Sequence, residues 1–432
     1  MKKLLRLFWE FFKISLFVVG GGYAIIVVAD EVFGKKLKWL QEGELLDHLP
    51  VFQMIPGLIA GNTAIYTGLK VAGRLGAVVA LAAVALPSIV IFLGVSCGYA
   101  FLPTENPWVE SALLGLRSAL TGVIFGTLIK GWRRSVVGWY GYVTVVLASL
   151  LLIVFGVNVV AVLVTAMLVG VVWAYCGGAT PSRDDDSCGV ELPPLSRVQK
   201  AFLIMVSLVA LSVLTVFCGR MFWTFLKFGL LGFGGGYVLV PIYMQEFVGE
   251  TAPLLRLHAE EFSNLMALTQ ITPGPVSVNA ATFFGYRLST TGMDQEISAF
   301  LFYARGVVGG VLATTALLLP SLFLLTIALT GIEKWKKSRF VRGLLFGVKP
   351  ATNALILKAG VAFIGMSVLT WSAEPVFTVL SFPVHSCSIH PFSIVLALFA
   401  GWMLVKGRLS IMATIFLCAV FGALGHTATL LA

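Results

Sequence analysis

The sequence predicts an all-α polytopic membrane protein with about 11 to 13 transmembrane segments, arranged as two inverted repeats that contain broken or re-entrant helices. Three observations support this prediction: an apolar composition, long hydrophobic runs and an internal duplication. Of the 432 residues, 58% are hydrophobic and only 12% are charged. That is too little polar surface to cover a soluble globule.

Hydrophobic runs long enough to cross about 30 Å of hydrocarbon recur along the chain. A multi-pass membrane location follows as the expectation, and the lipid bilayer is the first expected partner. The runs lie at residues 72–102, 109–129, 135–176 (room for two spans), 199–219, 297–330, 341–370, 391–405 and 409–430.

Two stretches of the chain repeat each other. Residues 9–23 read WEFFKISLFVVGGGY and residues 223–237 read WTFLKFGLLGFGGGY, with eight of fifteen positions identical. A second shared signature follows each copy, QMIPG at 53–57 and QITPG at 270–274, and a Pro-Ser pair comes later in both. We therefore predict two homologous repeats, 1–176 and 199–432, joined by a polar linker at 177–198, with an extra span at 199–219 in the second repeat.

Basic loops indicate that the repeats are inverted. The first repeat has its basic turn at 130–134, whereas in the second repeat the earlier hairpin, 334–342, is the basic one. Because Lys and Arg in short loops stay cytoplasmic, matching hairpins face opposite sides. The side of the 30–48 loop stays open, since Lys35, Lys36 and Lys38 would lie outside if both neighbouring segments crossed fully.

The charge balance does not indicate a nucleic-acid partner. The chain has 30 Lys and Arg against 20 Asp and Glu, but the cations are spread over short loops and form no basic stripe. Three potential metal ligands, His385, Cys387 and His390, lie in one polar insertion, where three ligands without a fourth are more often incidental. No Walker A, nucleophile elbow or dinucleotide motif occurs in a suitable context, so we expect neither a cofactor nor enzymatic activity.

Each repeat contains helix-breaking residues inside apolar sequence. A Gly triplet permits either tight helix crossing or an unwound segment whose N-H groups face an anion. A Pro-Gly pair either kinks a helix or ends it, and a new helix start inside the membrane presents free N-H groups suited to an oxyanion. The flanking amides of Gln53, Gln270, Asn62 and Asn279 can donate to an oxyanion or satisfy the broken backbone.

Matched charged residues complete the candidate site. Lys13 and Lys227 precede their Gly triplets by seven residues, which is two helical turns, and either face the site or snorkel to the headgroups. For proton coupling the repeat offers Glu31 and Glu246, which otherwise lie at a solvated loop edge. The predicted substrate-binding set is Lys13, Gly20, Gly21, Gly22, Gln53, Pro56, Gly57, Asn62, Lys227, Gly234, Gly235, Gly236, Gln270, Thr272, Pro273, Gly274, Pro275 and Asn279, with Arg117, Lys349, Glu31 and Glu246 as further candidates.

The ordered set of motifs resembles the chromate ion transporter family in its long, two-domain form. LFVVGGGY and LLGFGGGY precede QMIPGLIAGN and QITPGPVSVN, and LPSIV and LPSLF follow. The resemblance covers nearly the whole chain, with one departure, since Leu58 stands where the family favours a second proline.

The resemblance implies a secondary active transporter that exports chromate, or a similar oxyanion such as sulfate, across the cytoplasmic (inner) membrane and is driven by the proton gradient. The residues leave two alternatives, an oxyanion channel and a sulfate-type anion transporter. Chromate and sulfate are tetrahedral dianions of similar size, so backbone donors and cations separate them poorly. Self-association into a homo-oligomer stays open.

Overall fold

The computed structural model describes most of the chain, divided into two compact units. The first unit comprises Met1–Ala100, Leu163–Leu239 and Pro273–Lys349, and the second comprises Phe101–Val162, Val240–Thr272 and Pro350–Ala432. Each unit thus takes segments from both predicted repeats, and the division of the sequence at 1–176, 177–198 and 199–432 stays a prediction. The described residues are 2–18, 22–99, 101, 106–136, 138–176, 219–233, 236–250, 252–292, 298–336, 338–379 and 382–431.

Several sequence predictions fall outside the described residues. They are the linker at 177–198, the extra span at 199–219 apart from its last residue, and four glycines of the two triplets, Gly20, Gly21, Gly234 and Gly235. The side chains of His385 and Cys387 are also outside the described part.

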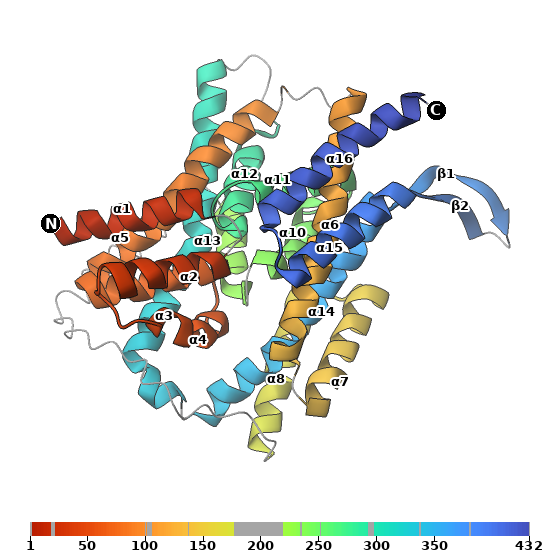
Figure 1. The fold of residues 1–432 in the computed structure, drawn as a ribbon. Coiled ribbons are helices and arrows are strands. Elements are labelled where there is room, and N and C mark those ends of the chain that lie inside the picture. Colours follow the sequence, from red (N-terminus) through yellow and green to blue (C-terminus); the bar gives the residue numbers. More distant parts are fainter. Residues whose placement is uncertain are drawn as a thin grey trace. The chain divides into compact units, whose positions relative to one another are not determined.

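Short helices begin the first unit. The helix α1 packs on α5, and its Leu7 and Phe11 are fully buried (Figure 1). The carboxylate of Asp30 accepts hydrogen bonds of 3.0 Å from the backbone N-H groups of Gly43 and Leu45, which fixes the turn before α3. The elements are α1 (Lys2–Phe17), α2 (Gly22–Asp30), the π-helix η1 (Glu31–Lys36), α3 (Glu44–Asp47) and α4 (Leu49–Met54).

The element α5 (Ile59–Tyr99) is a pair of helices and not one rod. Ala72 (φ −147°, ψ 24°) and Gly73 (φ 65°, ψ −155°) leave helical geometry, so helices form over 59–71 and 74–99. They fold back on each other, because Gly68 lies against the Gly76 carbonyl and Gly61 against Leu81. A first arm of 13 residues is about 20 Å long, which is shorter than the hydrocarbon layer.

The second repeat forms a similar hairpin in the same unit. The helices α12 (Val276–Thr290) and α13 (Ala299–Lys336) pack side by side, with Gly285 against Gly309 and the Thr282 and Thr314 hydroxyls 2.7 Å apart. Residues 219–231 are helical and lead to the 3-10 turn η3 (Gly236–Leu239).

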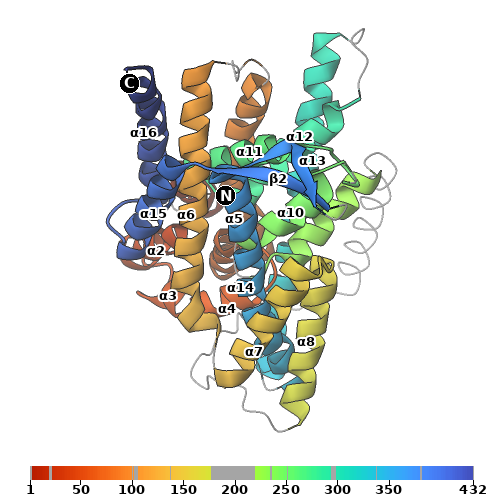
Figure 2. The same ribbon diagram turned by 90° about the vertical axis from the view of Figure 1, so that its right-hand side faces the viewer.

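The second unit is built around α6 (Pro107–Ser135). The helices α15 (Pro391–Lys406) and α16 (Ile411–Leu431) lie along it, where Gly122 meets the Ala397 carbonyl and Gly115 the Cys418 carbonyl (Figure 2). Small residues at such crossings let the backbones approach closely. The other elements of this unit are α7 (Gly138–Ser149), the π-helix η2 (Leu150–Val154), α10 (Val240–Phe247), α11 (Ala259–Ile271) and the antiparallel strands β1 (Leu369–Val379) and β2 (Phe382–Ile389). Two further helices, α8 (Val159–Tyr175) and α14 (Arg339–Ser367), each contribute residues to both units.

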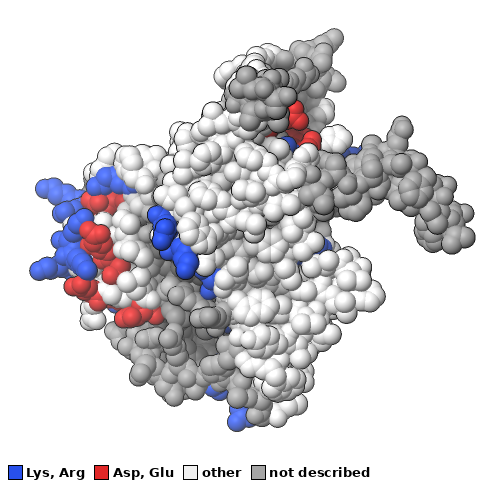
Figure 3. Space-filling view, turned by 45° about the vertical axis from the view of Figure 1, so that its right-hand side comes forward, with Lys and Arg blue, Asp and Glu red and all other residues white. Residues whose placement is uncertain are grey.

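The helices have the length and composition of membrane spans. Four described helical segments qualify, Ile59–Tyr99, Pro107–Trp132, Ala299–Leu329 and Arg339–Ser367, and four shorter apolar helices accompany them. Charged side chains gather in patches on the face seen in Figure 3, with broad uncharged areas between them. The protein is an all-α polytopic membrane protein, as predicted, with one β-hairpin, and the span count of about 11 to 13 stays a prediction.

Candidate functional site

The first Pro-Gly pair ends one helix and precedes another. The helix α4 stops at Met54, Ile55 is extended (φ −87°, ψ 132°), and α5 begins at Ile59. Gly57 has φ 119°, a backbone conformation that side chains with a Cβ rarely adopt. The predicted break is confirmed, and the kink alternative is wrong here, because four residues between the helices have no helical assignment.

The second Pro-Gly pair repeats this geometry. The helix α11 ends at Ile271, Thr272 is extended (ψ 146°), and Gly274 has φ 99°. Pro275 is the N-cap of α12, which then starts at Val276. The first N-H groups of 59–71 and of α12 have no carbonyl within their own helix, so both starts carry a positive partial charge.

Two buried asparagines satisfy the backbone before the breaks. Nδ2 of Asn62 donates to the carbonyls of Phe52 (2.9 Å) and Ile55 (3.2 Å). Nδ2 of Asn279 donates to the carbonyl of Pro273 (3.4 Å). Both side chains are fully buried. Of the two predicted roles, these contacts serve the structural one.

Gly232, just before the second Gly triplet, and Gly236, its last residue, each contact one of the breaks within the first unit. The N-H of Gly57 donates to the carbonyl of Gly232 (3.0 Å). Four residues further on, a side chain at Gly236 would meet Ser277 and Val276 in the first turn of α12. Gly22 of the other triplet is the first residue of α2. The first break therefore lies next to Gly232, and the start of α12 lies next to Gly236.

Two serines that sequence reasoning did not select also contact the breaks. A side chain at Gly57 would overlap the Ser321 hydroxyl, and one at Gly274 would overlap the Ser88 hydroxyl. Each serine belongs to the Pro-Ser pair of the opposite repeat, so the contact is reciprocal. The recurrence of Pro-Ser at matched positions was the signal in the sequence that could have identified them.

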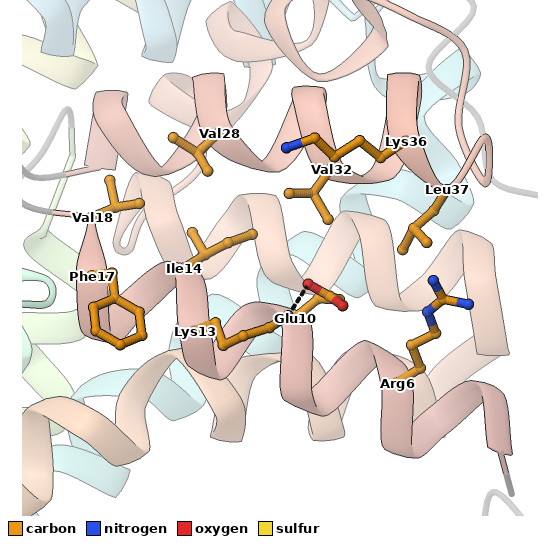
Figure 4. A pocket seen from close by; sticks show the side chains of 10 residues that line it. All are labelled: Arg6, Glu10, Lys13, Ile14, Phe17, Val18, Val28, Val32, Lys36 and Leu37. Atoms are coloured by element: carbon orange, nitrogen blue, oxygen red, sulfur yellow. Dashed lines mark ion pairs between the residues drawn. The ribbon is translucent and has the colours of Figure 1, made fainter.

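The predicted cations differ in their surroundings. Lys13 forms an ion pair with Glu10 (2.8 Å), and the two side chains lie in a groove of about 430 Å³ between α1 and the α2–η1 stretch (Figure 4). Apolar side chains, among them Ile14, Val28 and Val32, form its walls. Lys227 is half-buried on the helix 219–231.

The four further charged candidates from the sequence are spread over several helices. Arg117 is buried on α6, and its Nη1 donates to Oε1 of Glu260 at 2.8 Å. Glu31 is exposed and pairs with Lys36 (2.9 Å), and the Lys36 ammonium holds the pKa of this carboxyl below its usual value. Glu246 lies half-buried in α10 of the second unit, and Lys349 is half-buried in α14.

The predicted amides and Thr272 are divided between the two units. Gln53 is half-buried on α4 in the first unit, whereas Gln270 is buried on α11 in the second. The Thr272 hydroxyl donates to the carbonyls of Leu268 (3.2 Å) and Thr269 (3.4 Å), so it closes the last turn of its own helix.

Sequence reasoning missed a buried polar cluster in the first unit. Oε1 of Glu44 accepts from the Tyr66 hydroxyl (2.6 Å) and from the Lys70 ammonium (2.7 Å), and the Gln41 N-H donates to Oε2 (3.0 Å). The Tyr66 oxygen also lies 3.1 Å from Nε2 of His48. Burial alone would raise the pKa of Glu44, but these donors together lower it below its ordinary value.

Comparison with known proteins identifies the family. The family model for chromate transporters matches residues 5–171 and 219–423. The chain belongs to the chromate transporter family. The match covers the sequence signatures and both Pro-Gly breaks described above.

Three relatives of this chain are distant in sequence but match most of its length. An uncharacterised transporter of Methanocaldococcus jannaschii is 25% identical over 86% of this chain and 86% of its own length. The chromate transport protein of Pseudomonas aeruginosa is 25% identical over 87% of this chain and 83% of its own length. The chromate transport protein of Cupriavidus metallidurans is 23% identical over 85% of this chain and 84% of its own length. No solved structure matches this member of the chromate transporter family.

Proposed function

We propose that this protein exports chromate, or a similar tetrahedral oxyanion, across the cytoplasmic membrane and uses the proton gradient to do so. One observation supports the proposal above the others. The two Pro-Gly breaks are far apart in the sequence, yet within one compact unit the first contacts Gly232 and the helix start after the second contacts Gly236, only four residues further along the chain. Membership of the chromate transporter family supports the choice of substrate class.

The chemistry of the breaks suits an anion. Two helix starts present N-H donors and positive partial charge, and a preorganised set of such donors replaces the water shell of an oxyanion. Lys13 and Lys227 are the proposed charge-compensating residues, with an amide contact from Gln53 of the same unit. Lys13 would exchange its ion pair with Glu10 for the substrate, since both line the same open groove.

For proton coupling Glu246 is the better candidate of the two predicted carboxylates. Glu31 is exposed and its pKa is lowered by Lys36, so it stays ionised across the neutral range. Glu246 is half-buried. A Glu246→Gln variant is expected to lose the dependence of transport on pH, and an unchanged profile would remove this residue from the mechanism.

The test of the proposed function is uptake of labelled chromate and sulfate into everted membrane vesicles, with and without a proton gradient. Gradient-dependent chromate accumulation by the wild type, lost in Lys227→Ala, supports the proposal. Accumulation of sulfate alone would change the substrate, and accumulation of neither anion would refute the proposal. Stimulation by unlabelled anion on the far side separates a transporter from a channel, which shows no such exchange. Lys38→Ala, at an exposed lysine outside the candidate set, is the matched control.

A further inference from the structure

Two serine hydroxyls inside the first unit have no hydrogen-bond partner among the described residues. Ser88 and Ser321 are fully buried, and neither hydroxyl makes a bond within the described part of the chain. A serine in an apolar helix normally donates to the carbonyl four residues earlier. Ser96, on the same helix as Ser88, does so, with its hydroxyl 2.6 Å from the Phe92 oxygen.

The carbonyl that Ser88 would use is already occupied. The Ser15 hydroxyl donates to the oxygen of Val84, four residues before Ser88, at 2.6 Å. In the second repeat the corresponding carbonyl, Leu317, lies against Gly229. In both repeats, therefore, the helix that precedes the Gly triplet packs against the carbonyl to which the serine would otherwise donate.

Both free hydroxyls face a helix start. Ser321 lies against Gly57, two residues before the helix 59–71 begins, and Ser88 lies against Gly274, two residues before α12 begins. An unsatisfied buried hydroxyl costs about 1–3 kcal/mol. Two of them at matched positions, each beside the positive N-terminal end of a helix, indicate donors that a ligand satisfies.

We propose that Ser88 and Ser321 are substrate-binding residues, whose hydroxyls donate to the oxygens of the oxyanion held at the two helix starts. The inference rests on the proposed function and adds the side-chain donors to its backbone donors. An oxyanion with four oxygens can accept from a hydroxyl and from N-H groups at the same time, and the positive helix starts disfavour a cation there. Because each serine comes from the opposite repeat, a bound anion would link both repeats within this unit.

The test uses Ser88→Ala, Ser321→Ala and the double variant of the full chain, purified and reconstituted in lipid nanodiscs. Alanine keeps the Cβ and removes only the hydroxyl. The dissociation constants of sodium chromate and sodium sulfate are measured by calorimetry, and the melting temperature is measured without anion. Each single variant is expected to weaken binding about 10-fold and the double variant about 100-fold, since one hydrogen bond to a charged group is lost at each site. The melting temperatures are expected to stay close to that of the wild type.

Two control variants lose hydroxyls that donate within their own helices, Ser96→Ala on α5 and Thr315→Val on α13. Both are expected to bind like the wild type. Wild-type affinity in the double variant would overturn the inference and leave the proposed function intact. A wild type that binds and transports neither anion would overturn both. Should the alanine variants not fold, Ser88→Cys and Ser321→Cys keep the size of the side chain with a weak donor, and the same loss of affinity is expected.

Discussion

The hydroxyl oxygen of Ser321 occupies the space that a side chain at Gly57 would need. The same relationship holds between Ser88 and Gly274. Each Pro-Gly break is therefore held in place by a helix from the opposite repeat, and each glycine has a positive φ as well as a close neighbour. Conformation and packing together exclude other residue types at both positions.

Replacement of either glycine by alanine is expected to destabilise the protein by at least about 3 kcal/mol, since the strained φ and the overlap with serine add. Gly43→Ala is the control for conformation alone, because Gly43 has φ 84° and nothing within reach of a Cβ. The Gly43→Ala variant is expected to lose about 1 kcal/mol of its free energy of unfolding. Thermal denaturation of the purified variants measures the difference, and equal losses in Gly57→Ala and Gly43→Ala would contradict the role of Ser321.

Asn62→Asp is expected to destabilise the first break by about 2–3 kcal/mol. The substitution removes the amide that donates to Phe52 and Ile55 and places a carboxylate against both carbonyls. Asn106→Asp is the matched control, since the Asn106 side chain accepts from the Trp108 N-H, a role that a carboxylate also fills. A melting temperature of Asn62→Asp equal to that of the control would show that the two carbonyls do not need this donor.

The cluster around Glu44 predicts a pH dependence of stability. Because folding lowers the pKa of Glu44 below its ordinary value of 4.5, the stabilisation is complete above about pH 4.5 and is lost as the pH falls further. At pH 7, Glu44→Gln is expected to lose about 2 kcal/mol, since the bonds from Tyr66 and Lys70 then end on a neutral acceptor.

The measurement is the melting temperature of both proteins between pH 7 and about pH 2.5, since the loss is expected below pH 4.5. The gap between wild type and Glu44→Gln is expected to narrow toward the acid end, and a constant gap would exclude ionisation of Glu44 as its cause. Glu42→Gln is the control, because both side chains of its pair with Lys35 are exposed and solvent screens their attraction.

The sequence predicted the fold best where particular residue types determine the backbone conformation. Pro56-Gly57 and Pro273-Gly274 predicted both breaks, since proline removes a donor and glycine permits a positive φ. The turn inside α5 was not predicted, because Ala72 and Gly73 lie between Lys70 and Arg74 without a proline to end the helix, and the hairpin depends on the packing of Gly68 on Gly76.

Pairings between distant residues were also beyond the sequence. Arg117 was a candidate for the substrate, yet its partner Glu260 is 143 residues away and no local spacing identifies it. The Glu44 carboxylate stood in a loop with several acidic residues, and only the fold buries it beside Tyr66. Side-chain roles such as these follow from tertiary contacts, whereas a repeated motif indicates only that a position matters in both copies.

The Arg117–Glu260 pair predicts a non-additive effect on stability in the second unit. Glu260→Gln is expected to destabilise by about 1–2 kcal/mol, because the Arg117 guanidinium is 6% exposed and would lose its carboxylate partner. In an Arg117→Met background the same substitution is expected to have no effect, since no buried charge remains there. Thermal denaturation of the four proteins gives the coupling energy, with Glu250→Gln at an exposed position as the control. Equal losses from Glu260→Gln in both backgrounds would mean that Arg117 is not held by Glu260, which would leave the guanidinium available to an anion.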